Sequence, residues 1–554
     1  MAVLASSMAY AGGTYRPNTI IKVEDGSISV QDYIVDTESN TTALDELKKS
    51  QYGTDDSAPQ AWVKDGQGTL NIDTSTTTTV DGEEVVVPSA TPTKVYNTIM
   101  VREGTVNISN TSIQNYNGLS NGVSNLAVGG KNAVLNLDNA HYEQRIEFAS
   151  NYGSSVNIGT GDGSGTVNLT NGSTLHSDHC IFMGRTNTTY KGQAVYVQPS
   201  YAGTAGDALY AYVENPPTSE VNISGASKMS TGTQLYIDNA TINIDGSGSA
   251  LIGAERVIAG EPNEKIYSTY MGHKDGAKAE VNVTNGGEFS LYRGLCTGSG
   301  EDANVSINVS GEGSTFSVRH STIDAHGGVG TSSFLGVVAS STTSITVSDK
   351  AKMKLGDNWV YLGYGGSSAT ITIEKTASLE QIDSASPAGI FMCGENANLI
   401  NHGTTEVGIL MYDGTFSMVD GAVAAGLTAT AGTINLSGAV TFTGAVMLGD
   451  AAPALTINIT QGATLIFENQ VELSNAVINV LLSDEDYEGE QLFTIASVKG
   501  VELDDVKLQL NYDDVTKETV GAAGYVTNTI IPEPTTATLS LLALMGLAAR
   551  RRRK

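Results

Sequence analysis

The most regular feature of this chain is a triplet in which Asn lies between two aliphatic residues. The triplet recurs twelve times, and two further copies carry Thr in the middle. Side chains alternate between the two faces of a strand, so the aliphatic residues should point into a core and the central residue outward. The Asn triplets are centred on Asn71, Asn107, Asn136, Asn157, Asn168, Asn222, Asn243, Asn282, Asn308, Asn435, Asn458 and Asn479, and the Thr triplets on Thr346 and Thr372.

A second recurring element is an apolar strand that ends in Gly. It occurs at Cys180–Gly184, Val360–Gly363 and Ile390–Gly394. Where no insertion intervenes, neighbouring triplets lie 21 to 26 residues apart. A period of this length, with short strands and Gly-containing turns, predicts that each repeat is one turn of a β-solenoid. Leucine-rich repeats have the same period, but they would show Leu at fixed positions in every repeat, and this sequence lacks that pattern.

We therefore expect an all-β fold, a right-handed parallel β-helix (β-solenoid) with a C-terminal β cap and a short C-terminal hydrophobic helix. The repeat resembles the passenger-type, autotransporter-like β-helices of bacterial surface proteins. We interpret the outward Asn side chains as a structural row, with amides hydrogen-bonded from one turn to the next. A ligand-binding row is the alternative.

The repeat also divides the chain into segments. The first residues should form a cap or leader, in which Thr42–Lys49 has the composition of a short helix with Thr42 as N-cap and Asp45 at N3. Beyond the repeats, 491–495 and 506–510 suggest antiparallel strands of a terminal cap. The expected segments are 1–11, a signal-peptide remnant; 12–60, the cap or leader; 61–480, the repeats, with insertions at 186–220 and 254–278; 481–529, the β cap; and 530–554, a sorting signal.

The last segment combines three physical elements. Pro532, Glu533 and Pro534 force an extended entry, because each proline fixes φ and disfavours helix before it. An uncharged run follows, 535–549, too short to span a bilayer comfortably. A cationic end that stays on the cytoplasmic side closes the chain. The apolar run contains Leu539, Leu541, Leu542, Leu544 and Leu547, and the cationic end is Arg550, Arg551, Arg552, Arg553 and Lys554.

These residues together resemble the PEP-CTERM sorting signal. The resemblance implies export, transient anchoring in the inner membrane, cleavage near the motif by an exosortase, and delivery to the cell surface, outer membrane or extracellular matrix. An ordinary tail anchor is the alternative. The small residues Ala9 and Ala11, with Tyr10 between them and Gly12 after them, agree with the end of a secretory signal that starts upstream of Met1.

Charge narrows the classes of partner. The chain has 30 Lys and Arg residues against 59 Asp and Glu, a formal net charge of −29. Such an excess excludes a nucleic-acid binder, which needs clustered cations to contact phosphates. It also disfavours adhesion to anionic lipid and favours hydration in a matrix.

Binding residues are expected in the insertions, because loops that project from a regular scaffold often carry function. Tyrosine rings there could stack on extracellular polysaccharide or other glycans, although they could equally pack the loop onto the body. The candidate glycan-binding residues are Tyr190, Tyr196, Tyr201, Tyr210 and Tyr212; Tyr267 and Tyr270 belong to the second insertion.

Few groups of residues in the sequence could form a catalytic or metal site. The best clusters are His176, Asp178, His179 and Cys180, and His320, Asp324 and His326. If His176, Asp178 and Cys180 shared one strand face, they could offer three zinc ligands, yet no other repeat supplies an evident catalytic partner. The three cysteines, Cys180, Cys296 and Cys393, are too few and too widely spaced for a disulfide framework and are interpreted as inert buried thiols.

We therefore predict no catalytic residues, metal or cofactor. The leading interpretation is a non-catalytic surface or matrix protein, structural or adhesive. A carbohydrate-binding protein is the first alternative. A polysaccharide lyase or hydrolase is the second, since β-helices also support those activities.

Overall fold

The computed structural model describes residues between 19 and 530, with several gaps. It divides into two units, Met1–Ala388 and Gly389–Lys554, which are described in turn. The gaps of five or more residues are 50–60, 117–124, 146–154, 185–216, 254–268, 320–332, 383–387, 450–454 and 482–492, and shorter gaps occur elsewhere.

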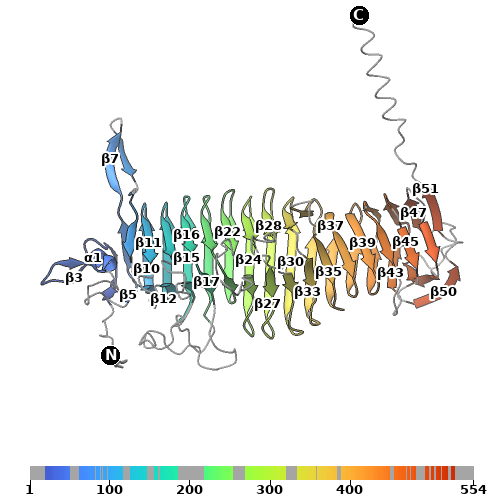
Figure 1. Ribbon diagram of the computed structural model, residues 1–554, viewed down its shortest axis with the longest axis horizontal. Coiled ribbons are helices and arrows are strands. Elements are labelled where there is room, and N and C mark those ends of the chain that lie inside the picture. The colour runs from blue at the N-terminus through green and yellow to red at the C-terminus, as the bar shows by residue number, and fades with distance from the viewer. Residues whose placement is uncertain are drawn as a thin grey trace, which may run out of the picture. The chain divides into compact units, whose positions relative to one another are not determined.

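The first unit is built from three parallel ladders, which we call A, B and C (Figure 1). Each coil of chain adds one strand to ladder C, then one to A, then one to B. Such a long all-parallel sheet is consistent with the predicted β-solenoid. Ladder A contains β2 (Ser27–Ser29), β6 (Thr69–Asp73), the second half of β10 (Thr98–Ser109), the second half of β12 (Asn125–Asp138), β15 (Gly165–Thr170), β18 (Ser219–Ile223), β21 (Ala240–Asp245), β24 (Lys278–Thr284), β27 (Asn304–Ser310), β30 (Thr342–Ser348) and β33 (Ser368–Ile373).

Ladders B and C complete each coil of the first unit. Ladder B contains β9 (Thr93–Val95), β11 (Ser112–Tyr116), β13 (His141–Arg145), β16 (Thr174–Ser177), β19 (Lys228–Thr231), β22 (Ala250–Gly253), β25 (Glu288–Leu291), β28 (Thr315–Val318), β31 (Lys352–Leu355) and β34 (Ser378–Gln381). Ladder C contains β1 (Thr19–Lys22), β5 (Ala61–Asp65), the first halves of β10 and β12, β14 (Ser155–Ile158), β17 (Cys180–Met183), β20 (Leu235–Ile237), β23 (Thr269–Met271), β26 (Leu295–Thr297), β29 (Ser333–Leu335) and β32 (Trp359–Leu362).

The second unit has the same organisation, with three parallel ladders of its own. The first contains β36 (Ala397–Asn401), β38 (Thr415–Met418), β40 (Thr433–Leu436), β43 (Leu455–Thr460), β46 (Ala476–Leu481) and β49 (Lys507–Tyr512). The second contains the starts of β37 (Thr404–Met411) and β39 (Val423–Ala429), then β41 (Ala439–Phe442), β44 (Thr464–Phe467), β47 (Phe493–Ser497) and β51 (Val526–Ile530). The third contains β35 (Gly389–Met392), the ends of β37 and β39, β42 (Val446–Leu448), β45 (Val471–Ser474) and β48 (Val501–Asp504).

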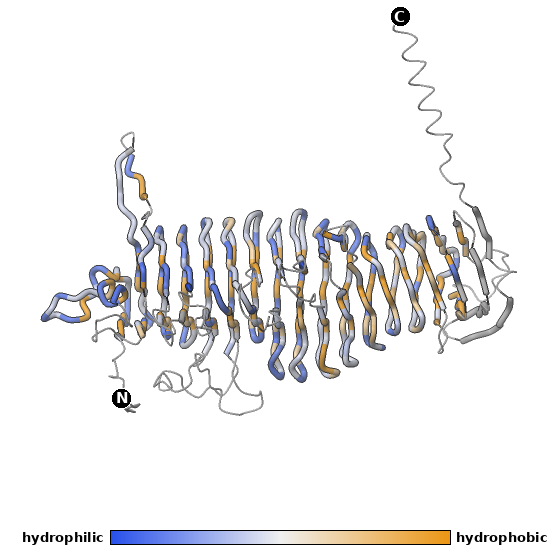
Figure 2. The backbone as a smooth tube through the Cα atoms, viewed as in Figure 1, coloured by the Kyte–Doolittle hydropathy of each residue, from blue (hydrophilic) through white to orange (hydrophobic). Residues whose placement is uncertain are grey.

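The repeated triplets set the register of ladder A. Val281 pairs with Ile307 and Asn282 with Asn308, and the aliphatic residues on either side are 0–1% exposed. Apolar and polar positions accordingly alternate along the stacked strands (Figure 2). The core of the unit is the stack of these inward aliphatic side chains, as the alternation predicted.

Gly-ended strands mark the corner after ladder C. Gly184 has φ +60°, and a Cβ there would lie 2.0 Å from the carbonyl oxygen of Asn239 in the next coil. Only glycine fits so close to a neighbouring backbone in a left-handed conformation. The recurrent Gly therefore allows the chain to turn sharply from ladder C into ladder A.

The N-terminal segment joins the first ladders directly. β1 pairs with β5 and β2 with β6, both in parallel. β3 (Ile34–Asp36) and β4 (Thr41–Thr42) form an antiparallel pair, and α1 (Ala43–Lys48) follows. The predicted N-cap is confirmed: the Thr42 hydroxyl accepts from the backbone N–H of Asp45, whose carboxylate accepts from the backbone N–H of Thr42.

A hairpin interrupts the chain between β6 and β9. β7 (Thr76–Val80) and β8 (Glu83–Val87) pair in antiparallel fashion and lead away from the stacked strands of the first unit (Figure 1). Val85, Val86 and Val87 are 40–51% exposed. The hairpin belongs to a two-stranded sheet of its own, separate from the parallel ladders.

Two expectations about the repeats need correction. β23 lies inside the expected insertion 254–278, yet it pairs in register with β20 and β26 and carries Tyr270 in ladder C. At the other end, 491–495 and 506–510 are not antiparallel to each other. β47 pairs in parallel with β44, and its buried Phe493 and Ile495 continue the inward alternation, while β49 pairs in parallel with β46. The antiparallel partner of β49 is instead β50 (Val515–Gly521).

Candidate functional site

The residues assigned to sorting and to glycan binding lie outside the described part of the chain. This applies to 531–554, with the Pro-Glu-Pro motif, the apolar run and the cationic end, and to Tyr190, Tyr196, Tyr201, Tyr210 and Tyr212. Tyr267 and the cluster His320, Asp324 and His326 also lie outside it. Of the helical residues that the structure describes, none forms an apolar segment of the length that a bilayer crossing requires.

The central row of ladder A is the most regular polar feature. Asn107 Nδ2 donates to Asn71 Oδ1 at 2.9 Å, and the same bond repeats at 2.8–3.1 Å along the row to Asn308. In the second unit, Asn458 and Asn479 continue an equivalent row from Asn435. The predicted amide bonds between turns are therefore confirmed. We call these central residues the amide row.

One triplet does not belong to this row. Asn157 lies in β14 of ladder C, between Ala127 of β12 and Phe182 of β17. Its side chain is only 6% exposed and donates to Ser155 Oγ at 3.0 Å. The triplet pattern alone could not show this, because ladder C also needs alternating aliphatic residues.

The outward row of ladder B contains the main cluster of reactive side chains. His176 in β16 lies between Glu143 of β13 and Ser230 of β19. Its Nδ1 is 2.7 Å from Ser230 Oγ, and its Nε2 is 3.2 Å from Asp178 Oδ1. Asp178 is only 5% exposed. A hydroxyl, an imidazole and a buried carboxylate are thus connected in series.

The neighbouring coil adds a charged pair to this cluster. Arg145 Nη2 lies 2.7 Å from Glu143 Oε2, and Gln114 Nε2 donates to the same oxygen at 2.9 Å. The hydrogen bond to Glu143 raises the pKa of Arg145 above its ordinary value, with smaller contributions from Glu143 and Asp178 charge. Arg145 therefore remains a cation in the electrostatic field of Asp178.

Sequence analysis identified His176 and Asp178 but missed Glu143, Arg145 and Ser230. The missed residues lie in other coils, from 31 to 54 positions away, and meet His176 or Asp178 only because strands stack in register. The sequence showed no evident partner for this cluster in another repeat, whereas the register of ladder B brings Ser230 of the next coil within hydrogen-bonding distance of His176. Knowing the register of ladder B would have been enough to find them.

The proposed zinc set is not assembled. β16 ends at Ser177 and β17 begins at Cys180, so the chain turns a corner and the residues do not share one strand face. Cys180 is buried, and its sulfur lies 3.4 Å from Thr233 Oγ1 and 3.7 Å from His179 Nε2. Among the described residues, no group of three His, Cys, Asp or Glu side chains could hold a metal ion.

The cysteines are free thiols, and two of them are less buried than expected. Cys180 is buried, whereas Cys296 and Cys393 are partly exposed. Burial nevertheless raises the pKa of Cys296 to about 11 and raises that of Cys393. Both thiols are therefore protonated near neutral pH, which agrees with the inert role predicted for them.

Aromatic rings occupy the outward row of ladder C. Phe182, Tyr236 and Tyr270 stack with ring centroids 5.0 and 4.9 Å apart. Cys296 follows in register, and Phe334 and Tyr361 then stack at 5.2 Å. In face-to-face stacks the rings cover one another's faces, so this row contributes mainly to packing between coils.

A second charged network surrounds Lys64 in the first coils of the unit. Lys64 is fully buried, in register with Ile21 and Val101, and its Nζ donates to the carbonyl oxygens of Asp65, Gly66 and Glu103 at 2.5–3.0 Å. Burial lowers the pKa of Lys64 to about 8.

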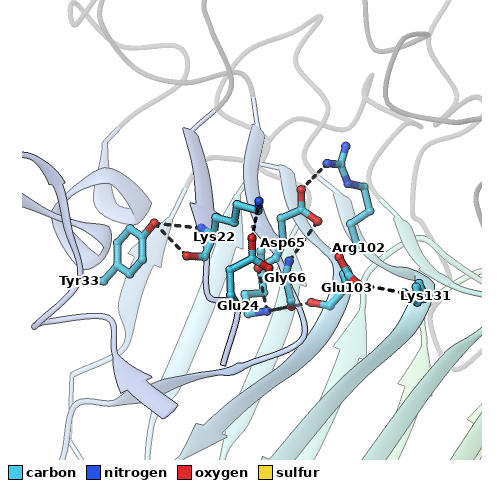
Figure 3. A network of polar contacts seen from close by, with 9 residues as sticks. Lys22, Glu24, Tyr33, Asp65, Gly66, Arg102, Glu103 and Lys131 are labelled. Carbon is cyan, nitrogen blue, oxygen red and sulfur yellow. Dashed lines mark hydrogen bonds and ion pairs between the residues drawn. The ribbon is translucent and has the colours of Figure 1, made fainter. Parts of the chain in front are cut away.

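Charged residues that act on Lys64 also form ion pairs with other side chains (Figure 3). Arg102 pairs with Asp65 at 2.5 Å, Lys22 pairs with Glu24, and Lys131 lies 3.9 Å from Glu103. The contact with the Glu103 carbonyl ties β5 to the irregular register of β10, while the other two contacts hold the chain directly after Lys64. We interpret the network as structural.

Comparison with known proteins adds no assignment to these sites. No family model matches the chain, and neither a curated protein nor a solved structure shows significant similarity to it.

Proposed function

We propose that this protein is an exported surface or matrix β-helix, structural or adhesive, in which a right-handed solenoid carries a C-terminal cap. The observation that carries the proposal is the amide row. The same side chain makes the same bond in coil after coil from Asn71 to Asn308. Such repetition stabilises an extended scaffold, because each coil needs only its neighbours.

Charge is the second support. A net charge of −29 keeps a repetitive β protein hydrated and opposes edge-to-edge association. The outward Asn, Ser and Thr residues of ladder A add a polar, weakly charged surface. These properties suit a protein that works at high local concentration outside the cell.

The C-terminal sequence supports sorting through a PEP-CTERM signal and cleavage by an exosortase. Pro532, Glu533 and Pro534 would present an extended cleavage region, while the apolar helix and cationic end hold the protein transiently in the inner membrane. Replacing both prolines with Ala should extend the helix and trap full-length protein there.

Mass spectrometry of the surface-released protein tests the sorting proposal. We expect chains that end near the Pro-Glu-Pro motif. Removal of the five C-terminal cations should let the tail pass through the membrane during export, because the positive-inside barrier is lost. Recovery of released molecules that still end in Lys554 would show that the tail is not processed.

Carbohydrate binding is the second candidate. It is favoured by two half-exposed rings, Tyr364 in the first unit and Tyr412 in the second, each 50% exposed. Tyr364 contacts Phe334 edge-on with centroids 5.1 Å apart, so its ring is held in place. A glycan array with the released protein, compared with the Tyr364→Ala and Tyr412→Ala variants, tests this role.

A further inference from the structure

We propose that Ser230, His176 and Asp178 form a nucleophilic site that hydrolyses small acyl esters, such as ester groups carried on an extended polymer. The inference goes beyond the proposed scaffold function and departs from the expectation that the protein is not an enzyme. It rests on the outward row of ladder B alone. The sorting proposal can fail without affecting it.

The hydrogen bonds fix the protonation pattern of the neutral imidazole. A carboxylate only accepts, so the contact of His176 Nε2 with Asp178 Oδ1 at 3.2 Å requires the proton on Nε2. Nδ1 is then the acceptor, 2.7 Å from Ser230 Oγ. The Ser230 hydroxyl therefore donates to the ring nitrogen that must take its proton. The two ring nitrogens have exchanged roles relative to the common serine-protease arrangement.

The positions of the three groups suit their roles. Asp178 is 5% exposed and orients the ring, whereas His176 and Ser230 are partly exposed on the outer side of β16 and β19. Arg145, in the coil below, supplies positive charge near Asp178. Nucleophile and base thus face solvent, and the orienting group does not.

A cation for the developing oxyanion is available on the same face. Lys228 precedes Ser230 by two residues in β19 and is exposed. Residues two apart lie on one side of a strand, roughly 7 Å apart. The flexible stem of Lys228 can bring its ammonium group to an oxygen bound over Ser230. We assign it the stabilising role that backbone N–H groups, here engaged between strands, usually fill.

The reaction balances with water as the only co-reactant. Ser230 Oγ bonds to the acyl carbon as its proton moves to His176 Nδ1, and the alkoxy oxygen leaves with that proton. Water then attacks the acyl-enzyme and gives a proton to His176, which returns it to Ser230 as the acid is released. The row lies on an outward sheet face, so it suits an ester on a chain that can lie along the coils.

A fluorophosphonate probe and p-nitrophenyl acetate test the proposal on the full folded chain. We expect the probe to label Ser230, identified by peptide mapping, and ester turnover to fall at least about 100-fold in Ser230→Ala and His176→Gln. Lys228→Met should lower turnover without preventing labelling. Ser344→Ala, a partly buried serine on ladder A, is the matched control and should retain full activity.

Peptide mapping of the wild-type chain makes the test independent of whether a variant folds. Absence of label on Ser230, or equal turnover in Ser230→Ala and Ser344→Ala proteins with matching melting curves, would overturn the proposal. Loss of melting temperature alone in His176→Gln, with turnover retained, would assign the cluster a structural role instead.

Discussion

The outward rows of ladders A and B differ in how their side chains repeat from coil to coil. In ladder A, one side chain repeats: Asn282 donates to Asn243 and accepts from Asn308, and its neighbours do the same. In ladder B, unlike side chains are neighbours, so that Glu143, His176 and Ser230 follow one another in register. The backbone pairing is parallel in both rows, and only the side chains change.

This difference separates stabilising positions from positions that can carry chemistry. A repeated amide both donates and accepts, so the row satisfies itself whatever its length. A mixed row brings unlike side chains together at a single place. Regular stacking of the coils does not require such an arrangement. Lys64, a buried cation in register with Ile21 and Val101, is an interior example of such a position that occurs once.

The largest loss of stability should come from placing negative charge in the amide row. The double change Asn282→Asp and Asn308→Asp removes two donors and sets two carboxylates in neighbouring coils, near Glu280, which accepts from Asn282 at 3.1 Å. We expect a loss of about 2–6 kcal/mol at pH 7, since each unsatisfied or charged group costs about 1–3 kcal/mol. Thermal and urea unfolding followed by circular dichroism measure it.

Protonation provides the control for this change. Below about pH 4 an Asp carboxyl carries a proton and can donate again, so the difference from wild type should shrink. A penalty that stays the same from pH 7 to pH 3.5 would mean that packing, not charge and hydrogen bonding, governs the row.

Lys64→Met tests a position that occurs once. The variant leaves carbonyl oxygens such as those of Gly66 and Glu103 without their donor, and we expect a loss of about 2–4 kcal/mol at pH 7. The pKa of Lys64 is lowered from 10.5 to about 8 in the fold, so unfolding takes up a proton between these values. Wild-type stability should therefore gain from this group as pH rises from 8 to 10.5.

Melting curves of the wild-type protein and of Lys64→Met at pH 7 and pH 9.5 show whether Lys64 makes the fold more stable or less stable as pH rises. The wild-type protein should gain relative to Lys64→Met at the higher pH. An equal response of the two proteins would show that Lys64 keeps its ordinary pKa in the fold.

A smaller loss of stability is expected in ladder C, where similar side chains stack from coil to coil as they do in the amide row. Tyr236 stacks on both Phe182 and Tyr270, so Tyr236→Ala loses two aromatic pairs, worth about 1–3 kcal/mol together. Tyr364→Ala, at a ring that is 50% exposed, is the control and should cost less. Equal losses would contradict a packing role for the stack.

The smallest loss of stability should follow when Asn in the amide row is replaced by another polar residue that favours β-strands. Thr346 and Thr372 already occupy the positions in register above Asn308. Replacing Asn282 and Asn308 with Thr should therefore cost less than about 1 kcal/mol, near the range of cross-strand pair differences. Any ligand binding should remain intact. A loss of binding with an unchanged melting curve would show that the amides have a direct role in recognition.

Local patterns in the sequence were enough to predict the strands and their repetition. The alternation around Asn282 determines which side chains are buried, since a one-residue shift would expose every aliphatic residue of the strand. Thr42 and Asp45 likewise predict the start of α1, because a capping box involves only neighbours in the chain. The amide row follows from the same repetition once strands stack.

What the sequence could not determine depends on register between distant coils. Asn157 has the same local pattern as Asn168, yet only the three-dimensional pairing places it in ladder C. Tyr270 looks like a loop residue until β23 is seen to pair with β20. The contact of His176 with Ser230 spans 54 residues, a separation that varying insertions make irregular. Local sequence therefore determines which face of a strand is buried, whereas stacking in the tertiary structure decides which outward side chains meet.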